Sequence, residues 1–214
     1  MASKSYKNYL QNLKDVDRLI NTHSNESGTT QGKKGLGHLT RSGVVMFCAA
    51  FEVYIEEVVE EIVEIYIQKF DNLKDFPKQL KKRVAFLTKE HKNELEVINL
   101  VGDGWKDVLR SFLRNDLSQL NTPKYGNIDI VFNRYVGIKE FSNKWEFDKD
   151  KLNDFVSNRG EIAHNGGKAN YVKISFLKSS RDSITILTKE IDCLVCDHIT
   201  TITPGNSQPW RKRF

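Results

Sequence analysis

The chain has 214 residues, of which 39% are hydrophobic and 29% are charged. This size suits one domain with a buried core, and the composition is ordinary for a soluble globular protein. A formal net charge of +5 and a pI of about 9.0 favour a polyanionic partner without establishing one, because many basic proteins bind no nucleic acid. The presence of four prolines favours long helices over an all-β fold.

Cysteine content and hydropathy exclude several classes of protein. Three cysteines and the lack of an apolar leader in residues 1–15 argue against a secreted, disulfide-stabilised protein. The most apolar stretch, residues 44–67, contains six glutamates and does not predict a membrane span. We therefore expect a reducing, cytoplasmic setting. Cys193 and Cys196 lack the second ligand pair that a zinc site needs, so they predict core packing, and we expect no metal and no cofactor.

Two long helices are predicted in the first third of the chain. Apolar residues three and four positions apart predict an amphipathic helix over residues 4–22, and a flexible loop follows. The longest helix is predicted over residues 38–70, with Thr40 or Ser42 as its N-cap. Its first half is apolar nearly all round and should be buried, whereas its second half has an acidic outer face. Glu52 is the one acid in the buried half, so it needs a partner.

The middle of the chain begins with a basic segment. Residues 77–88 predict a short basic amphipathic helix, and another helix is predicted over residues 103–120. The basic side chains of the first helix form either a solvated face or a surface that follows the backbone of bound RNA. The residues expected to contact substrate there are Lys81, Lys82 and Arg83.

A connector of less regular pattern follows over residues 124–147. Residues 128–132 predict a helical turn rather than a short strand, because no second strand pattern of similar strength lies nearby. Phe141 and Trp145 should anchor this connector to the core.

Asp148 begins the next predicted helix, which carries Arg159 and His164 and ends at Gly166 in the manner of a glycine C-cap. The last helix is predicted from about residue 174 to residue 201.

These elements predict an all-α fold, a helical bundle with a long central helix and an inserted helical and irregular segment. We expect a single domain over residues 1–203 and a basic, mobile tail over residues 204–214.

Arg159 and His164 are the residues that point to chemistry. Their spacing places them about 140° apart around an ideal helix, near an end where the geometry can relax towards a shared cleft. Cleavage of RNA by its own 2′-hydroxyl needs a base, an acid for the leaving 5′-oxygen and a cation for the phosphorane charge. Histidine suits the proton transfers and arginine suits the phosphate. Asn158 and Asn165 are placed to hold phosphate or ribose oxygens, and this chemistry needs no metal.

One chain offers one histidine in this context. The other histidines lie in unrelated parts of the sequence, at His23, His38, His91 and His198. A two-fold dimer that apposes the two motif helices would bring two His164 and two Arg159 side chains into one cleft, and two-fold dimers are the commonest oligomers. We therefore expect a homodimer with a composite site and RNA as its partner.

The run from Arg159 to Gly166, Arg-Gly-Glu-Ile-Ala-His-Asn-Gly, resembles the signature of the HEPN superfamily. Phe51-Glu52-Val53-Tyr54 looks like part of the long helix of two branches of that superfamily, one of which is RiboL-PSP-HEPN. The connector is similar as well, over Asn121-Thr122-Pro123 to Ile128, Val136-Gly137-Ile138 and Trp145. The resemblance covers residues 40–200, more or less.

This resemblance implies a HEPN-type bundle and a metal-independent endoribonuclease that acts as a dimer and leaves a 2′,3′-cyclic phosphate. Such proteins often belong to toxin–antitoxin, phage-defence or RNA-repair systems, so an antitoxin protein is a further expected partner. The resemblance also implies that Arg159 and His164 are the catalytic pair. Glu52, Tyr54 and Glu161 are expected in supporting positions around them.

The position after the arginine is usually polar in the superfamily, most often asparagine, and here it is Gly160. Asn158 or Asn165 is the expected replacement, but the glycine also favours an alternative, a non-catalytic dimeric module that binds RNA or a partner protein. Arg159 has a structural role available too, because it would neutralise Glu52, and the two roles are compatible. A third hypothesis, nucleotide binding or transfer, has no phosphate-loop or paired-carboxylate signature behind it.

Overall fold

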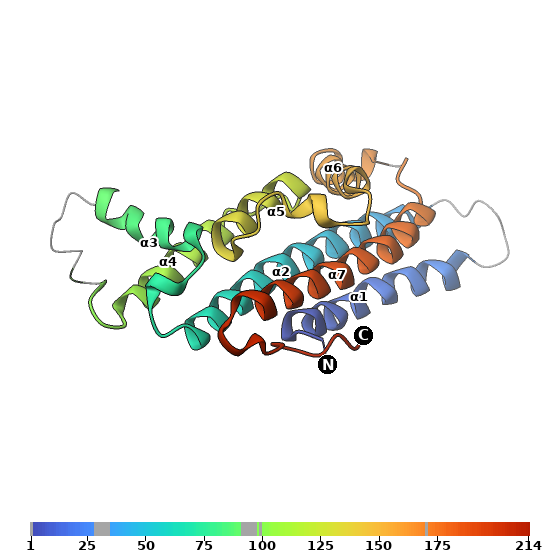
Figure 1. Cartoon of the computed structure of the whole chain (residues 1–214). Coiled ribbons are helices and arrows are strands. Elements are labelled where there is room, and N and C mark those ends of the chain that lie inside the picture. Colours follow the sequence, from blue (N-terminus) through green and yellow to red (C-terminus); the bar gives the residue numbers. More distant parts are fainter. Residues whose placement is uncertain (1, 28–34, 91–97, 99, 170) are drawn as a thin grey trace.

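The computed structural model describes residues 2–27, 35–90, 98, 100–169 and 171–214 (Figure 1). Over these residues the chain folds into α-helices joined by short 3₁₀ and π-helical turns, without a β-strand, so the predicted all-α class is confirmed. The α-helices, in chain order, are α1 (Lys4–Ser27), α2 (Gly37–Lys69), α3 (Lys78–Glu90), α4 (Gly104–Leu117), α5 (Tyr125–Val131), α6 (Lys149–Asn165) and α7 (Ile174–Ile202).

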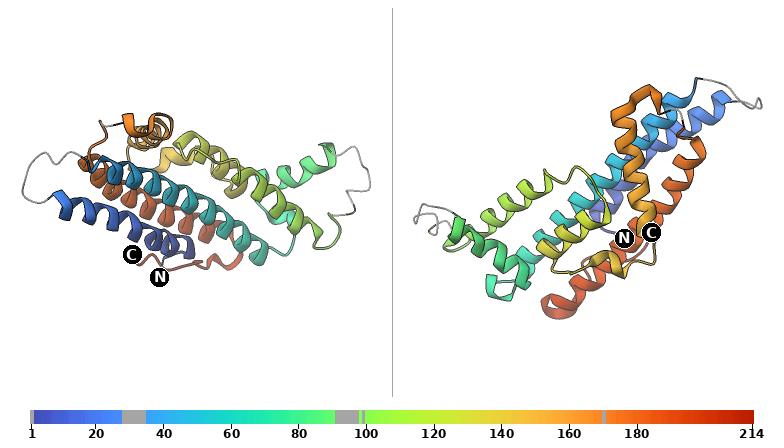
Figure 2. Two further views of the ribbon diagram at one scale, coloured as in Figure 1. Left: turned by 180° about the vertical axis from the view of Figure 1, so that it is seen from behind. Right: turned by 90° about the horizontal axis from the view of Figure 1, so that it is seen from above.

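Helix α2 forms the centre of the bundle. Helices α1 and α7 run along it and α6 crosses it, as Figure 1 and Figure 2 show from three directions. With 33 residues, α2 is the longest helix of the described chain, which confirms the predicted long central helix. Its position follows from its sequence, because its first half is apolar on nearly every side and needs several neighbours to cover it. The predicted burial of that half is incomplete, since Met46, Ala49 and Val53 stay exposed. None of the described helices combines the length and the apolar character needed to cross a membrane.

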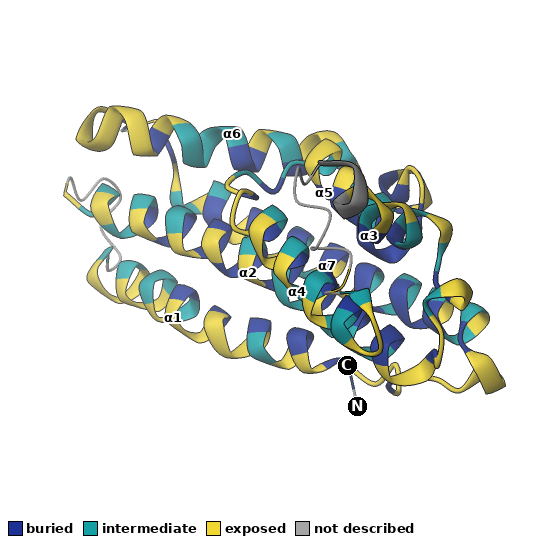
Figure 3. Ribbon diagram, turned by 90° about the vertical axis from the view of Figure 1, so that its left-hand side faces the viewer, coloured by how far each residue is buried: buried dark blue, intermediate teal, exposed yellow. Residues whose placement is uncertain are grey.

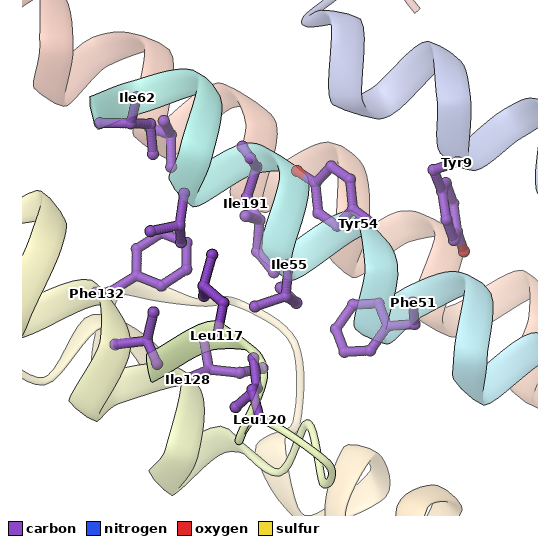
Figure 4. Close-up of a cluster of buried hydrophobic side chains, with 14 of the residues drawn as sticks. Tyr9, Phe51, Tyr54, Ile55, Ile62, Leu117, Leu120, Ile128, Phe132 and Ile191 are labelled. Carbon is purple, nitrogen blue, oxygen red and sulfur yellow. The ribbon is translucent and has the colours of Figure 1, made fainter. Parts of the chain in front are cut away.

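The core continues from the bundle into the connector. Figure 4 shows side chains of α2 meeting Tyr9 of α1 on one side and Ile191 of α7 on another. The rings of Tyr9 and Tyr54 lie 5.6 Å apart, and the Tyr54 hydroxyl donates to the carbonyl of Thr188 over 3.2 Å. Residues from the end of α4 and from α5 extend the same cluster, including Ile128, which is fully buried.

The predicted helical turn in the connector is confirmed, as α5 followed by a π-helix over Phe132–Val136. Phe132 stacks on Phe141 with 4.2 Å between ring centroids, and Phe141 meets Trp145 edge to face at 5.7 Å. These three rings attach the connector to the core, as expected for Phe141 and Trp145. Gly137 ends the π-helix with a φ of 86°, a conformation that glycine adopts without a steric penalty.

One predicted helix end and one predicted N-cap are wrong. Helix α1 continues to Ser27, past its predicted end at residue 22, and most of the remaining predicted loop lies outside the described residues. Helix α2 begins at Gly37, so neither Thr40 nor Ser42 is its N-cap. The first turn starts after Leu36 without a side-chain cap, and Thr40 is buried inside the helix.

The segment expected to be a mobile tail packs against the bundle. Trp210 is buried, and the ring of Phe214 contacts Tyr6 of α1 edge to face at 5.0 Å. Lys212 pairs with Asp197 of α7. The two ends of the chain consequently lie close together (Figure 1).

Helices α2 and α7 approach each other closely at Gly43, and this contact predicts a change in stability. A Cβ atom at Gly43 would lie 2.4 Å from Cδ2 of Leu177, which is fully buried. We expect Gly43→Ala to lower the free energy of unfolding by about 1 kcal/mol, because overpacking of about 1–3 kcal/mol exceeds a helix-propensity gain of about 0.5–1 kcal/mol. Chemical denaturation measures the difference.

The matched control is Gly160→Ala in α6, where a Cβ atom would meet nothing within 4 Å. That change should raise the free energy of unfolding by about 0.5–1 kcal/mol, because alanine is the better helix former. Equal gains at both positions would contradict the close packing of α2 on α7.

Candidate functional site at the end of helix α6

Helix α6 begins and ends as its sequence predicts. The Asp148 carboxylate accepts a hydrogen bond from the backbone N–H of Asp150 over 3.1 Å and caps the first turn. The backbone N–H of Gly166 donates to the carbonyl of Ile162, and Gly166 has a φ of 51° that ends the helix. Between these caps the helix is regular, so the spacing of its side chains is that of an ideal α-helix.

The buried side of α6 packs on α2. The rings of Phe155 and Phe47 lie 5.1 Å apart, and Phe155 also meets Phe176 of α7 at 6.2 Å. Arg159 follows Phe155 by four residues and precedes Ile162 by three, so it belongs to this packing stripe and is half-buried. A guanidinium group is therefore held at the crossing of α6 and α2.

The partner of Arg159 on α2 is Glu52. Burial raises the pKa of the Glu52 carboxyl, and the positive charge of Arg159 opposes that rise. The same charge lowers the pKa of Cys48, although burial dominates and raises it to about 12. The Oε2 atom of Glu52 is buried and accepts no hydrogen bond from the described residues. Arg159 thus compensates the buried carboxylate through charge rather than through a bond to both of its oxygens.

His164 lies on a different side of α6 from Arg159. Their separation of five positions turns the helix by about 140°, and His164 is exposed whereas Arg159 is half-buried. The expectation that the helix end relaxes and directs both side chains into one cleft is wrong for a single chain, because α6 stays helical through Asn165. In Figure 3 the C-terminal end of α6 is largely exposed, and His164 belongs to this outer face.

The outer face of α6 carries the other polar residues of the motif. Asn165 is exposed, and the Asn158 side-chain amide donates to the carbonyl of Asp154 over 2.8 Å. Asn158 also lines a surface hollow of about 410 Å³ beside the start of α7. The hydroxyl of Tyr171 donates to the Glu161 carboxylate. Sequence analysis missed Tyr171, which lies outside the motif and carries no periodic signal.

Several predicted site residues are not part of this region. Tyr54 is fully buried between α1 and α7, so it stabilises the core and does not lie beside Arg159 and His164 at the surface. Helix α3, with the predicted substrate contacts, lies towards the opposite end of the molecule from the end of α6 (Figure 2). On it, Lys81 donates to the carbonyl of Lys74 over 2.8 Å. The end of α6 and the basic helix therefore form two separate polar regions.

Acidic residues continue along α2 beyond Glu52. The pKa of Glu56 is raised from its ordinary value of 4.5 to about 7, mainly by burial and further by the negative charges of Glu52, Glu60 and Glu57. Within the described residues, no three histidine, cysteine, aspartate or glutamate side chains gather in a way that would hold a metal ion.

A comparison with protein-family models places the chain in a known group. The model described as RiboL-PSP-HEPN matches residues 6–197, which is most of the chain. The chain belongs to the RiboL-PSP-HEPN family. The match confirms the resemblance seen in the motif, the long helix and the connector. It also includes α1, which lies before the residues that this resemblance covers. No curated protein and no solved structure matched the chain.

Glu56 gives this part of the HEPN bundle a pH dependence. Its pKa of about 7 in the folded state lies above its ordinary value of 4.5, so the folded state binds the proton more tightly than the unfolded state. The stabilising contribution is complete below the ordinary value and is lost as the pH rises through about 7. Glu56→Gln removes this titration. We therefore expect the stability of the wild type relative to Glu56→Gln to fall between about pH 5 and about pH 8.

Denaturant unfolding of both proteins across this range checks the expectation. A constant difference in the free energy of unfolding would contradict the burial of the Glu56 carboxyl.

Proposed function

We propose that this HEPN protein is a metal-independent endoribonuclease that acts as a homodimer, with Arg159 and His164 of both protomers in one cleft. The observation that carries the proposal is the exposed position of His164 at the end of α6, on a helix whose Arg159 is half-buried and so keeps part of its side chain open to solvent. Helix α6 of one chain presents one histidine, whereas the reaction needs a base and an acid. Apposition of two α6 helices across a two-fold axis supplies both.

The proposed reaction is transesterification within the RNA. One His164 takes the proton of the 2′-hydroxyl as its oxygen attacks the adjacent phosphorus, and the bond from phosphorus to the 5′-oxygen breaks. The second His164 donates a proton to that leaving oxygen. Arg159 binds the phosphate oxygens whose charge grows in the transition state. The products are a 2′,3′-cyclic phosphate and a 5′-hydroxyl.

Asn158, Asn165 and the hydroxyl of Tyr171 lie on the outer face of the same helix end or beside it, where they are available to ribose and phosphate oxygens. A toxin–antitoxin, phage-defence or RNA-repair role in the cytoplasm, with an antitoxin as second partner, agrees with this activity. A gene for a small antitoxin beside the gene for this protein would support that context.

A second candidate function rests on Gly160. The position after Arg159 carries no side chain, although a Cβ atom there would meet nothing within 4 Å. The structure therefore has room for a polar side chain at this position, but glycine does not provide one. This favours a dimeric module that binds RNA or a protein without cleaving RNA.

The first test is cleavage of RNA in excess EDTA. We expect His164→Ala to lower the rate by about 10²–10⁴-fold, because it removes proton transfer. Arg159→Lys keeps a positive charge beside Glu52 and is expected to lower the rate by about 10²–10³-fold, because the bidentate phosphate contact is lost. A product with a 2′,3′-cyclic phosphate identifies the mechanism.

His38→Ala, which replaces another exposed histidine, is the matched control and should cleave like the wild type. Cleavage at the wild-type rate by both α6 variants would refute the proposal. Light scattering at micromolar concentration tests the composite site, and a species of single-chain mass alone would refute it.

The second test fills the open position. Gly160→Asn places an amide beside Arg159 without a steric clash, and we expect it to raise cleavage above the wild-type rate, with Gly160→Ala as the control for helix propensity. Expression in a bacterial host distinguishes the two candidate functions. An active ribonuclease arrests growth in a manner that depends on His164, and a binding module does not.

A further inference from the structure

A basic groove lies between α3 and the segment formed by α5 and the π-helix. It has a volume of about 280 Å³. Its lining contains three cationic side chains and no acidic one, and the lining residues are Gln79, Lys82, Arg83, Phe86, Ile130, Asn133 and Arg134. Helix α3, which supplies four of the lining residues, lies towards the opposite end of the molecule from the end of α6 (Figure 2).

Two of the cations in the groove are held by one carboxylate, that of Asp116 in α4. Its Oδ1 accepts from Arg83 over 3.0 Å, and its Oδ2 accepts from Arg134 over 2.6 Å. The hydroxyl of Tyr135 donates to the same oxygen. The Asp116 side chain is only 10% exposed, so its negative charge lies behind the two guanidinium groups rather than in the groove. One negative charge cannot neutralise both arginines, and Lys82 adds a third positive charge at the surface.

Aromatic contacts fix the position of Arg83 further. Its guanidinium lies 4.4 Å from the ring centre of Phe112 and 5.5 Å from that of Phe86. A group held on three sides loses little freedom when it meets a ligand, which favours binding.

The groove also presents apolar surface to solvent. Phe86 is 37% exposed and Ile130 is 53% exposed, at positions beside the cations. An exposed ring next to fixed positive charges matches the chemistry of a nucleotide, which carries an anionic phosphate and an apolar base face. The volume lies just under the range of about 300–1,000 Å³ for pockets that enclose a drug-sized ligand, so one nucleotide fits where a folded RNA does not.

We propose that this groove binds single-stranded RNA, with a phosphate on Lys82 and Arg134 and a base on Phe86. The amides of Asn133 and Gln79 face the same space and supply hydrogen bonds to the base edge. The choice of RNA rests on the proposed function, but binding here does not require cleavage. The groove therefore anchors the substrate at a distance from the site on α6.

The experiment measures binding of a fluorescent 2′-O-methyl RNA oligonucleotide to the full chain by anisotropy. This probe lacks the 2′-hydroxyl that the proposed reaction needs, so binding is observed without cleavage. We expect Lys82→Glu to weaken binding by about tenfold and to reduce the salt dependence by about 0.7 in the log–log slope, the value for one lost phosphate contact. Phe86→Ala should weaken binding by roughly 5- to 150-fold, the effect of losing one stacked base.

Lys14→Glu is the matched control, because it makes the same change of charge at an exposed site on α1. It should bind the probe like the wild type. Lys82 and Phe86 are both exposed, so their variants should fold normally, and thermal melting followed by circular dichroism verifies this.

The outcomes separate this proposal from the proposed activity. Binding by the wild type that is weakened in Lys82→Glu and Phe86→Ala supports the groove, even if unmodified RNA is not cleaved. Equal affinity of the wild type and both variants, or equal weakening by Lys14→Glu, would overturn it. So would a wild type that binds a poly-glutamate peptide but not the RNA, since that result assigns the groove to an acidic protein partner.

Discussion

The apolar circumference of the first half of α2 is the constraint on which the rest of the structure depends. A helix of this kind is stable only when neighbours cover it on several sides, and α1, α7 and α6 do so. Gly43 lets α7 approach α2 closely, Tyr54 contacts Tyr9 of α1, and Phe47 contacts Phe155 of α6. The same coverage buries the carboxyl of Glu52, and a buried carboxyl requires compensation. The positive charge of Arg159 supplies this compensation, so a residue of the motif also stabilises the core.

Helix α6 consequently serves two purposes on two sides. Its inner side packs on α2 and includes Arg159, and its outer side presents His164 to solvent. A change at Arg159 is therefore expected to disturb the packing of α6 on α2, whereas a change at the exposed His164 should leave that packing intact. The second polar region, around α3, is built on a different principle, because there a carboxylate orients arginines from behind and leaves their charge available at the surface.

Local sequence signals predicted most of the fold. The long central helix, the Asp148 cap and the Gly166 end follow from periodicity and capping chemistry, which act over a few residues. Features that join distant parts of the chain could not be predicted in this way. The joining of Arg83, Asp116 and Arg134 and the packing of Phe214 on Tyr6 depend on tertiary contacts that no local pattern encodes. The motif itself was found from its residues, but the divergence of its two side chains depended on whether α6 stays regular to its end.

The carboxylate of Asp116 also bears on how the molecule opens. It joins α4 to α3 through Arg83 and to the π-helix through Arg134 and Tyr135. Three elements that share one buried anchor lose their mutual contacts together when that anchor separates. We therefore expect these three elements to open as one cooperative unit, with amide protons that exchange with solvent in a common event rather than helix by helix.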